Sequence, residues 1–242
     1  PGRLAGMIVE VALAGISGTT RADLAWTAEG IAEGFTLTTF ATNFPNDGVN
    51  TTGPVGMAFP GNGVMVADWQ GHVRVFPSHA DGQDAGALSA TAYGLATAVG
   101  LAQIGGKLYV SQNEMSRVVQ VTPYGTFDQA IVDVFCATRL IADPLTGRLF
   151  VSGGCTGAGI TDVDPVARTA TAFNSALPDV LALSSDVRTL YAAVNRERIL
   201  GFDTSPMTQV FDSGTISYVH VIAHGGRVLP GKHIGNTHPG GY

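Results

Sequence analysis

Five short hairpins that recur about every 40 residues predict an all-β fold, a β-propeller of four-stranded blades. In the clearest hairpin, two apolar runs, 140–142 and 149–152, flank the turn Asp143-Pro-Leu-Thr-Gly147, in which proline fixes φ and glycine accepts a positive φ. The other four hairpins join 55–59 to 64–67, 99–102 to 108–111, 180–183 to 190–193 and 219–222 to 228–229. The second arms begin at Val64, Leu108, Leu149, Leu190 and Val228, which gives steps of 44, 41, 41 and 38 residues.

Each unit also has room for a third and a fourth strand. Third strands are predicted at 72–76, 117–121 and 198–202, and fourth strands at 87–92, 129–135, 169–173 and 208–211. Apolar and polar residues alternate more strongly in the fourth strands, as expected where one edge of a sheet meets water. A repeat of helical hairpins is the competing interpretation, but Gly and Pro interrupt every candidate helix within about ten residues.

The N-terminal part of the chain is expected to complete the ring. Residues 35–44 alternate like a fourth strand but precede the first hairpin, so we expect 36–44 to close the ring against the C-terminal blade and to leave no open sheet edge. The last hairpin has no evident third strand, so either residues 6–14 supply it or the natural protein continues. Five blades is the direct count, and a sixth blade, assembled from residues 1–50 or lost from this sequence, is the alternative. We expect a single propeller domain over 35–242, preceded by a segment, 1–34, whose structure the sequence leaves open.

The composition argues against several classes of protein. Only 13% of the residues are charged, 45% are hydrophobic and 32 are glycine, which fits a turn-dense β protein better than a disordered or coiled-coil chain. The net charge is −6 and the arginines form no cluster, so nucleic acid is not an expected partner. No apolar run approaches the ~20 residues needed to cross a bilayer, so no transmembrane span is expected.

The two cysteines are placed for a disulfide in the clearest hairpin. If its turn is centred between Asp143 and Arg148, residues whose numbers add to 291 pair across the two strands, and Cys136 lies directly opposite Cys155. Two buried free thiols are the alternative, because a turn shifted by one residue would separate the pair. A disulfide would indicate an oxidising compartment, extracellular or periplasmic.

Candidate site residues fall in the loops at one end of the predicted channel. In a propeller, the loops that join second to third strands gather at that end, where ligands usually bind. Asp68, Asn113, Glu114 and Asn195 lie in these loops and offer the oxygen ligands that calcium, or another divalent cation, prefers. Turn formation in solvated loops is the alternative for all four residues. Trp69 is a candidate for stacking on a sugar or another ring, or for packing over a neighbouring blade.

Four histidines, His220, His224, His233 and His238, occur near the C-terminal end. On a strand, His220 and His224 face the same side but lie about 13 Å apart at ~3.3 Å per residue, so they cannot bind one metal ion together unaided. We interpret the four as exposed loop residues. The sequence contains no nucleophile elbow, phosphate loop or zinc signature.

The first unit resembles a known superfamily. Its segments Gly53-Pro-Val-Gly-Met-Ala-Phe59, Gly63-Val-Met-Val-Ala-Asp68 and His72-Val-Arg-Val-Phe76 resemble the propeller repeats of the NHL, virginiamycin-B-lyase-like and gluconolactonase-like (senescence marker protein) superfamily, and the resemblance covers residues 53–230. It implies a propeller fold, which hosts lactonases, lyases and binding modules alike. Gluconolactonase-like enzymes hold a divalent cation through an acidic residue early in the first blade, whereas this first hairpin offers no glutamate.

Two functions from different classes follow. The favoured one is a secreted binding or scaffold module for a protein or a glycan, because the repeat is regular and no complete catalytic constellation accompanies it. The alternative is a divalent-metal lactonase or related hydrolase that uses Asp68, Asn113, Glu114 and Asn195. In that enzyme the cation would polarise a carbonyl group and an acidic side chain would move the proton.

Overall fold

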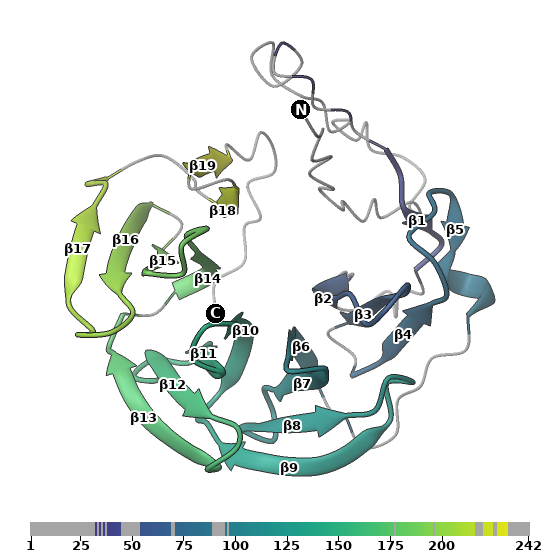
Figure 1. Cartoon of the computed structure of the whole chain (residues 1–242), viewed down its shortest axis with the longest axis horizontal. Coiled ribbons are helices and arrows are strands. Elements are labelled where there is room, and N and C mark those ends of the chain that lie inside the picture. The colour runs from purple at the N-terminus through teal and green to yellow at the C-terminus, as the bar shows by residue number, and fades with distance from the viewer. Residues whose placement is uncertain are drawn as a thin grey trace.

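The computed structural model of the chain describes residues 32, 34, 36, 38–44, 54–68, 71–88, 95, 97–176, 178–195, 197–215, 220–224 and 227–231. The main sheets are antiparallel and stand around a central axis, each with its first strand innermost (Figure 1). The predicted all-β propeller architecture is therefore confirmed.

Three units are complete four-stranded blades. The second blade consists of β6 (Ala98–Ile104), β7 (Lys107–Gln112), β8 (Arg117–Val121) and β9 (Phe127–Asp133). The third blade consists of β10 (Ala137–Asp143), β11 (Arg148–Gly153), β12 (Ile160–Asp164) and β13 (Thr169–Asn174). The fourth blade consists of β14 (Pro178–Leu183), β15 (Thr189–Val194), β16 (Arg198–Asp203) and β17 (Gln209–Asp212). Within the described residues, the first blade comprises β2 (Pro54–Ala58), β3 (Val64–Asp68) and β4 (Val73–Phe76), and the fifth unit comprises β18 (His220–His224) and β19 (Arg227–Gly231). All five predicted hairpins are present, and His220 and His224 are strand residues, the first and last of β18, and not loop residues as interpreted from the sequence.

The turn between β10 and β11 forms as its sequence predicts. The Asp143 carboxylate accepts the backbone N–H groups of Leu145 and Thr146, at 2.9 and 3.2 Å, and Gly147 has a φ of 77°. These bonds fix the hairpin on which the third blade is built.

Two strand predictions need correction. The fourth strand predicted at 87–92 does not begin at residue 87, because Ala85–Ala87 form a 3-10 helix, η1, that the Asp84 side chain caps; residues 89–92 lie outside the described residues. The apolar pattern also predicts no third strand in the third blade, whereas β12 supplies one. Asp162 lies inside β12, 3% exposed, with its carboxylate 2.6 Å from the half-buried Arg148 guanidinium, so a buried carboxylate in an ion pair interrupts the apolar pattern of this strand.

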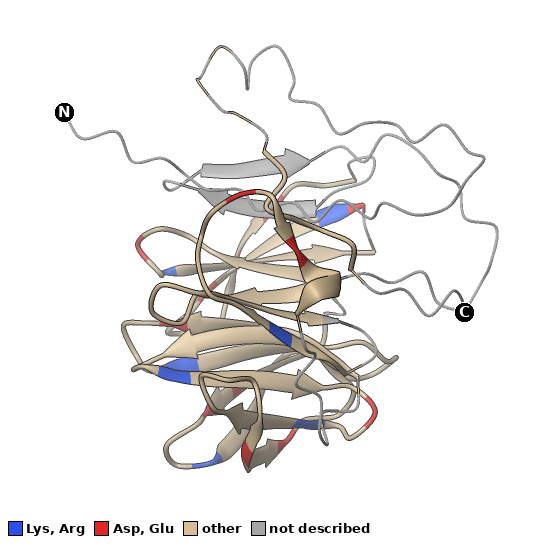
Figure 2. Cartoon of the chain, turned by 90° about the vertical axis from the view of Figure 1, so that its right-hand side faces the viewer, with Lys and Arg blue, Asp and Glu red and all other residues tan. Residues whose placement is uncertain are grey.

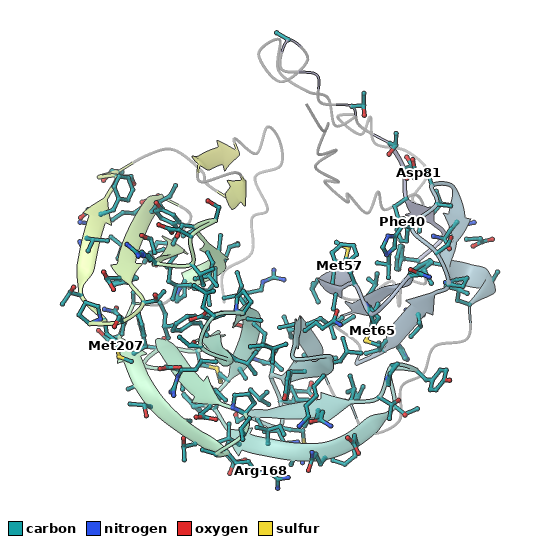
Figure 3. The ribbon with its side chains drawn as sticks, in the orientation of Figure 1. Phe40, Met57, Met65, Asp81, Arg168 and Met207 are labelled. Carbon is teal, nitrogen blue, oxygen red and sulfur yellow. A yellow bond between two sulfur atoms is a disulfide. The ribbon has the colours of Figure 1, made fainter. Side chains whose placement is uncertain are left out.

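Consecutive blades are held together by the two faces of each second strand. Met65 in β3, Tyr109 in β7 and Phe150 in β11 occupy the same position of the repeat, and each is at most 2% exposed in an apolar cluster shared with the following blade (Figure 3 labels Met65). Leu149 and Val151, on the other face of β11, pack against the preceding blade. The core is therefore a series of clusters, each shared by two consecutive blades.

Glycines let the innermost strands lie very close together. A Cβ atom on Gly56 would lie 2.3 Å from the Val99 carbonyl oxygen. A Cβ atom on Gly100 would lie 2.6 Å from both the Thr138 carbonyl oxygen and the Leu140 nitrogen. The backbones of β2, β6 and β10 are therefore in contact where these glycines lie, which no larger residue permits.

Buried serines stabilise a β-bulge in two innermost strands. The Ser111 hydroxyl accepts the Gly100 N–H at 2.8 Å, and the Ser152 hydroxyl accepts the Arg139 N–H at 3.1 Å. Both serines are 0% exposed. From the bulge in β10, the Arg139 guanidinium reaches the Val55 carbonyl oxygen in the first blade. The bulges thus keep their backbone donors paired although the ladder is interrupted there.

Substitution of Ser152 by alanine should lower the free energy of unfolding by about 1–2 kcal/mol, because the partly buried Arg139 N–H would lose its acceptor. Urea unfolding followed by circular dichroism measures the change. Ser185→Ala, in the exposed turn between β14 and β15, is the matched control and should leave the stability unchanged. A Ser152→Ala protein as stable as the wild type would mean that the bulge does not depend on this hydroxyl.

The described part of the N-terminal strand lies on the first blade, so the predicted closure against the C-terminal blade is not shown. β1 (Ala41–Thr42) pairs in parallel with β5 (Gln83–Asp84) and is not bonded to β18 or β19. Phe40 and Phe44 pack against Phe76 with ring centroids 5.0 and 5.9 Å away, on the face of the first blade that points away from the second (Figure 3 labels Phe40). This contact is close along the chain, so it closes a shorter loop than pairing with the C-terminal blade would.

Several expectations concern parts of the chain that lie outside the described residues. These are the strand at 6–14, the sixth blade and the domain boundary after residue 34, and they stay predictions. None of the helical residues that the structure describes forms a span with the length and hydropathy that a bilayer crossing requires.

Candidate functional site

The candidate residues lie where the second strands of three blades end. Asp68 is the last residue of β3, Asn113 and Glu114 follow β7, and Asn195 follows β15. Because the second strands of a propeller all run in the same direction, these loops lie on one rim of the ring. We call it the upper rim; it also carries the loops that precede the first strands. Trp69 and the side chain of Asp68 lie outside the described residues, so the roles predicted for them stay predictions.

Asn113 has a structural role in the upper rim. Its side-chain amide donates to the Cys136 carbonyl oxygen and its backbone N–H to the Thr97 carbonyl oxygen, both at 3.1 Å. Glu114 is exposed in the same turn, and Asn195 is exposed with a φ of 53°, a left-handed conformation that asparagine tolerates. Among the residues that the structure describes, no three His, Cys, Asp or Glu side chains are grouped to hold a metal ion. The predicted four-residue site for calcium or another divalent cation stays a prediction.

The predicted disulfide between Cys136 and Cys155 is present on the upper rim, with the two Cα atoms 5.7 Å apart. The predicted pairing holds near the turn of the hairpin, but the bulge in β10 shifts it by one residue, so that Ala137 pairs with Gly153. The disulfide therefore lies just beyond the ends of β10 and β11 and does not join two directly opposed strand residues. It ties the loop after β11 to the loop before β10.

Cys136 is the centre of a hydrogen-bond network between three loops. Its carbonyl oxygen accepts the Asn113 amide and also the Gly154 N–H, the latter at 2.8 Å, while its own N–H donates to the Ser116 hydroxyl at 3.0 Å. The Ser116 carbonyl oxygen accepts the Val134 N–H at 2.8 Å. Cys136 has a φ of 49°, which few residues other than glycine adopt. The loop that connects the second and third blades is therefore fixed from both sides.

Two large apolar side chains are exposed on this fixed segment. Met115, in the loop after β7, is 50% exposed, and Phe135, in the loop before β10, is 61% exposed. The bonds from Val134 and Cys136 to Ser116 hold the two loops side by side. Sequence reasoning placed Phe135 at the end of a fourth strand and gave Met115 no role. The signal that could have located this surface is the position of Phe135 next to a bridged cysteine.

Carboxylates with lowered pKa values have local structural causes. The Arg198 guanidinium, through its hydrogen bond, lowers the pKa of Asp212 to about 2, and the Ser184 hydroxyl lowers the pKa of Asp186. Both effects favour the ionised form, which suits an anchoring group and not a general acid, whose pKa must be raised. Along the ribbon seen from this side, Lys and Arg positions are sparse and interspersed with Asp and Glu (Figure 2).

Comparison with solved structures supports the fold. The chain is similar to a chain in the crystal structure of a nidogen/laminin complex, with a TM-score of 0.62, 15% sequence identity and coverage of 73% of this chain and 71% of that chain. It is also similar to hydrazine synthase of Kuenenia stuttgartiensis, with a TM-score of 0.54, 15% identity and coverage of 78% of this chain, but only 54% of the synthase chain. No protein-family model matches the sequence, and no curated protein sequence matches it either. Both structural neighbours are β-propeller proteins, and this chain is a β-propeller as well.

Proposed function

We propose that this chain is a protein-binding β-propeller module that acts in an oxidising compartment, extracellular or periplasmic. The observation that carries the proposal is the pair Met115 and Phe135, two large apolar side chains exposed on a rim that hydrogen bonds and a disulfide hold fixed. Apolar and aromatic side chains on preorganised segments are typical anchors of protein–protein interfaces, because little ordering cost is left for the binding step.

Three further observations support this function. The Cys136–Cys155 disulfide fits an oxidising compartment. One structural neighbour belongs to a complex of two proteins, although the other is an enzyme and the fold itself is compatible with both functions. The resemblance of the first repeat to the NHL and gluconolactonase-like superfamily fits a binding module of that type. Of the two partners expected from the sequence, a protein suits exposed Met and Phe side chains on neighbouring loops better than a glycan does.

The immobilised full chain should retain at least one protein from the extracellular or periplasmic fraction of its source cells. Free chain added in excess should displace that protein, because both compete for one rim. Mass spectrometry identifies the retained protein, and calorimetry with the purified pair should give a defined stoichiometry.

An unrelated immobilised protein of similar net charge is the control for non-specific retention. The proposal is wrong if nothing is retained beyond this control. Turnover of a lactone panel that depends on a stoichiometric divalent ion would instead favour the hydrolase.

A further inference from the structure

The exposed pair on the upper rim differs from the apolar side chains exposed at two turns of the third blade. Leu145 and Val166, 74% and 83% exposed, each stand alone at the tip of a turn that joins two strands of one blade. Met115 and Phe135 come instead from two different loops, which the bonds to Ser116 hold together. Two loops joined in this way present two apolar side chains from neighbouring segments, whereas a turn tip presents one.

The loop on the other side of the disulfide leaves Phe135 accessible. Residues 154–159 read Gly-Cys-Thr-Gly-Ala-Gly, so no side chain in this loop is larger than threonine. Gly154 is bonded to the Cys136 carbonyl oxygen, and Cys155 is joined to Cys136 by the disulfide. The loop is thus tied to Cys136, the residue after Phe135, and its small side chains leave the Phe135 ring exposed to a partner.

The charges next to the pair are negative. Glu114 precedes Met115, and Asp133 lies two residues before Phe135; both carboxylates are exposed. Among the described residues, no ion pair is formed by either of them. Arg117, the nearest cation, lies directly opposite Asp133 in the β8–β9 ladder, but it is half-buried, donates to the Gln112 side chain and is placed over the Phe127 ring at 5.7 Å. The apolar pair is therefore flanked by two exposed carboxylates that are not held in an ion pair within the described residues.

We propose that Met115 and Phe135, flanked by Glu114 and Asp133, form the docking surface for a partner-protein segment that carries an apolar anchor next to Lys or Arg. This inference rests on the proposed protein-binding function and specifies its surface and its partner chemistry. The apolar pair supplies the affinity, because buried aromatic anchors dominate interface energies. The carboxylates supply selectivity and faster association with basic segments.

The first test is a selection from a random library of displayed twelve-residue peptides on the full chain. Enriched peptides should combine an aromatic or aliphatic residue with neighbouring Lys or Arg. Phe135→Ser should weaken their binding by about 30-fold, the loss typical of a hot-spot residue. Leu145→Ser, on the opposite rim, is the matched control and should leave the affinity unchanged. Both replaced side chains are exposed, so both variants should fold, and circular dichroism verifies this.

The second test separates charge from apolar contact. Glu114→Lys should slow the association of basic peptides several-fold at low ionic strength and less so at high ionic strength, where charges are screened. Asp81→Lys changes the net charge equally and should have no such effect, because Asp81 lies in the turn after β4, away from the second and third blades (Figure 3).

The outcomes show separately whether the proposed docking surface fails and whether the proposed protein-binding function fails. Enriched peptides that lack basic residues, peptides that bind Phe135→Ser as tightly as the wild type, or no enrichment at all would overturn this inference. If Phe135→Ser still retains the protein captured by the wild type, the module binds proteins through another surface, so the function stands and this surface does not. If the wild type also captures nothing, the proposed function fails with it.

Discussion

Replacement of both Cys136 and Cys155 by serine should lower the free energy of unfolding by about 3 kcal/mol. The disulfide joins residues 19 apart in the sequence, and its loss gives the unfolded chain the conformational freedom that loop closure removes. Urea unfolding of the double variant and of the oxidised wild type, followed by circular dichroism, measures the difference.

Reduced wild-type protein is the matched control, and its stability should fall to that of the double variant. Thiol titration of denatured, unreduced wild type should detect no free thiol. Two free thiols, or a double variant as stable as the oxidised protein, would contradict this prediction.

Substitution of Gly100 by alanine should lower the free energy of unfolding by about 2 kcal/mol or more, because its Cβ atom has no room. The atoms in the way, the Thr138 carbonyl oxygen and the Leu140 nitrogen, belong to the backbone of β10 and cannot rotate aside as a side chain would. The second and third blades would have to move apart at their innermost strands, which would loosen the cluster that they share. Thermal and urea unfolding both measure the loss.

Gly106→Asn is the control for this substitution. Gly106 lies in the turn between β6 and β7 with a φ of 76°, and a Cβ atom there would meet nothing within 4 Å. Asparagine tolerates such a φ, so this variant should stay within about 0.5 kcal/mol of the wild type. Equal losses in the two variants would show that the cost at Gly100 comes from glycine removal in general and not from contact between blades.

The hairpins were predictable because each is encoded locally. Two apolar runs and a turn such as Asp143–Gly147 specify a hairpin without reference to the rest of the chain, and the repeat then multiplies the signal. The third strand of the third blade escaped prediction because Asp162 is buried there only through its ion pair with Arg148. Likewise, β1 pairs with β5 because the residues around it pack on an apolar face of the first blade that the second blade does not cover. That face exists only once the blades have assembled.

The sequence predicted where the candidate site lies but not what its residues do. The loops after the second strands were expected to matter, and Asn113 indeed lies in the network on the upper rim. Its role there, however, is to hold Cys136, which follows from a hydrogen bond between two blades. The exposure of Phe135 is equally non-local, because it depends on the small residues of the loop after β11.

The contacts between blades also determine the curvature of the ring. The first two interfaces are thin near the axis, where Gly56 or Gly100 lets two backbones touch, and thicker further out, where Met65 or Tyr109 stands between the sheets. An interface of this shape is a wedge, and the wedge angle decides how many blades fill a circle. Smaller side chains at the outer position would narrow the angle and leave room for more blades, so the number of blades is encoded in side-chain volumes and not in any single blade.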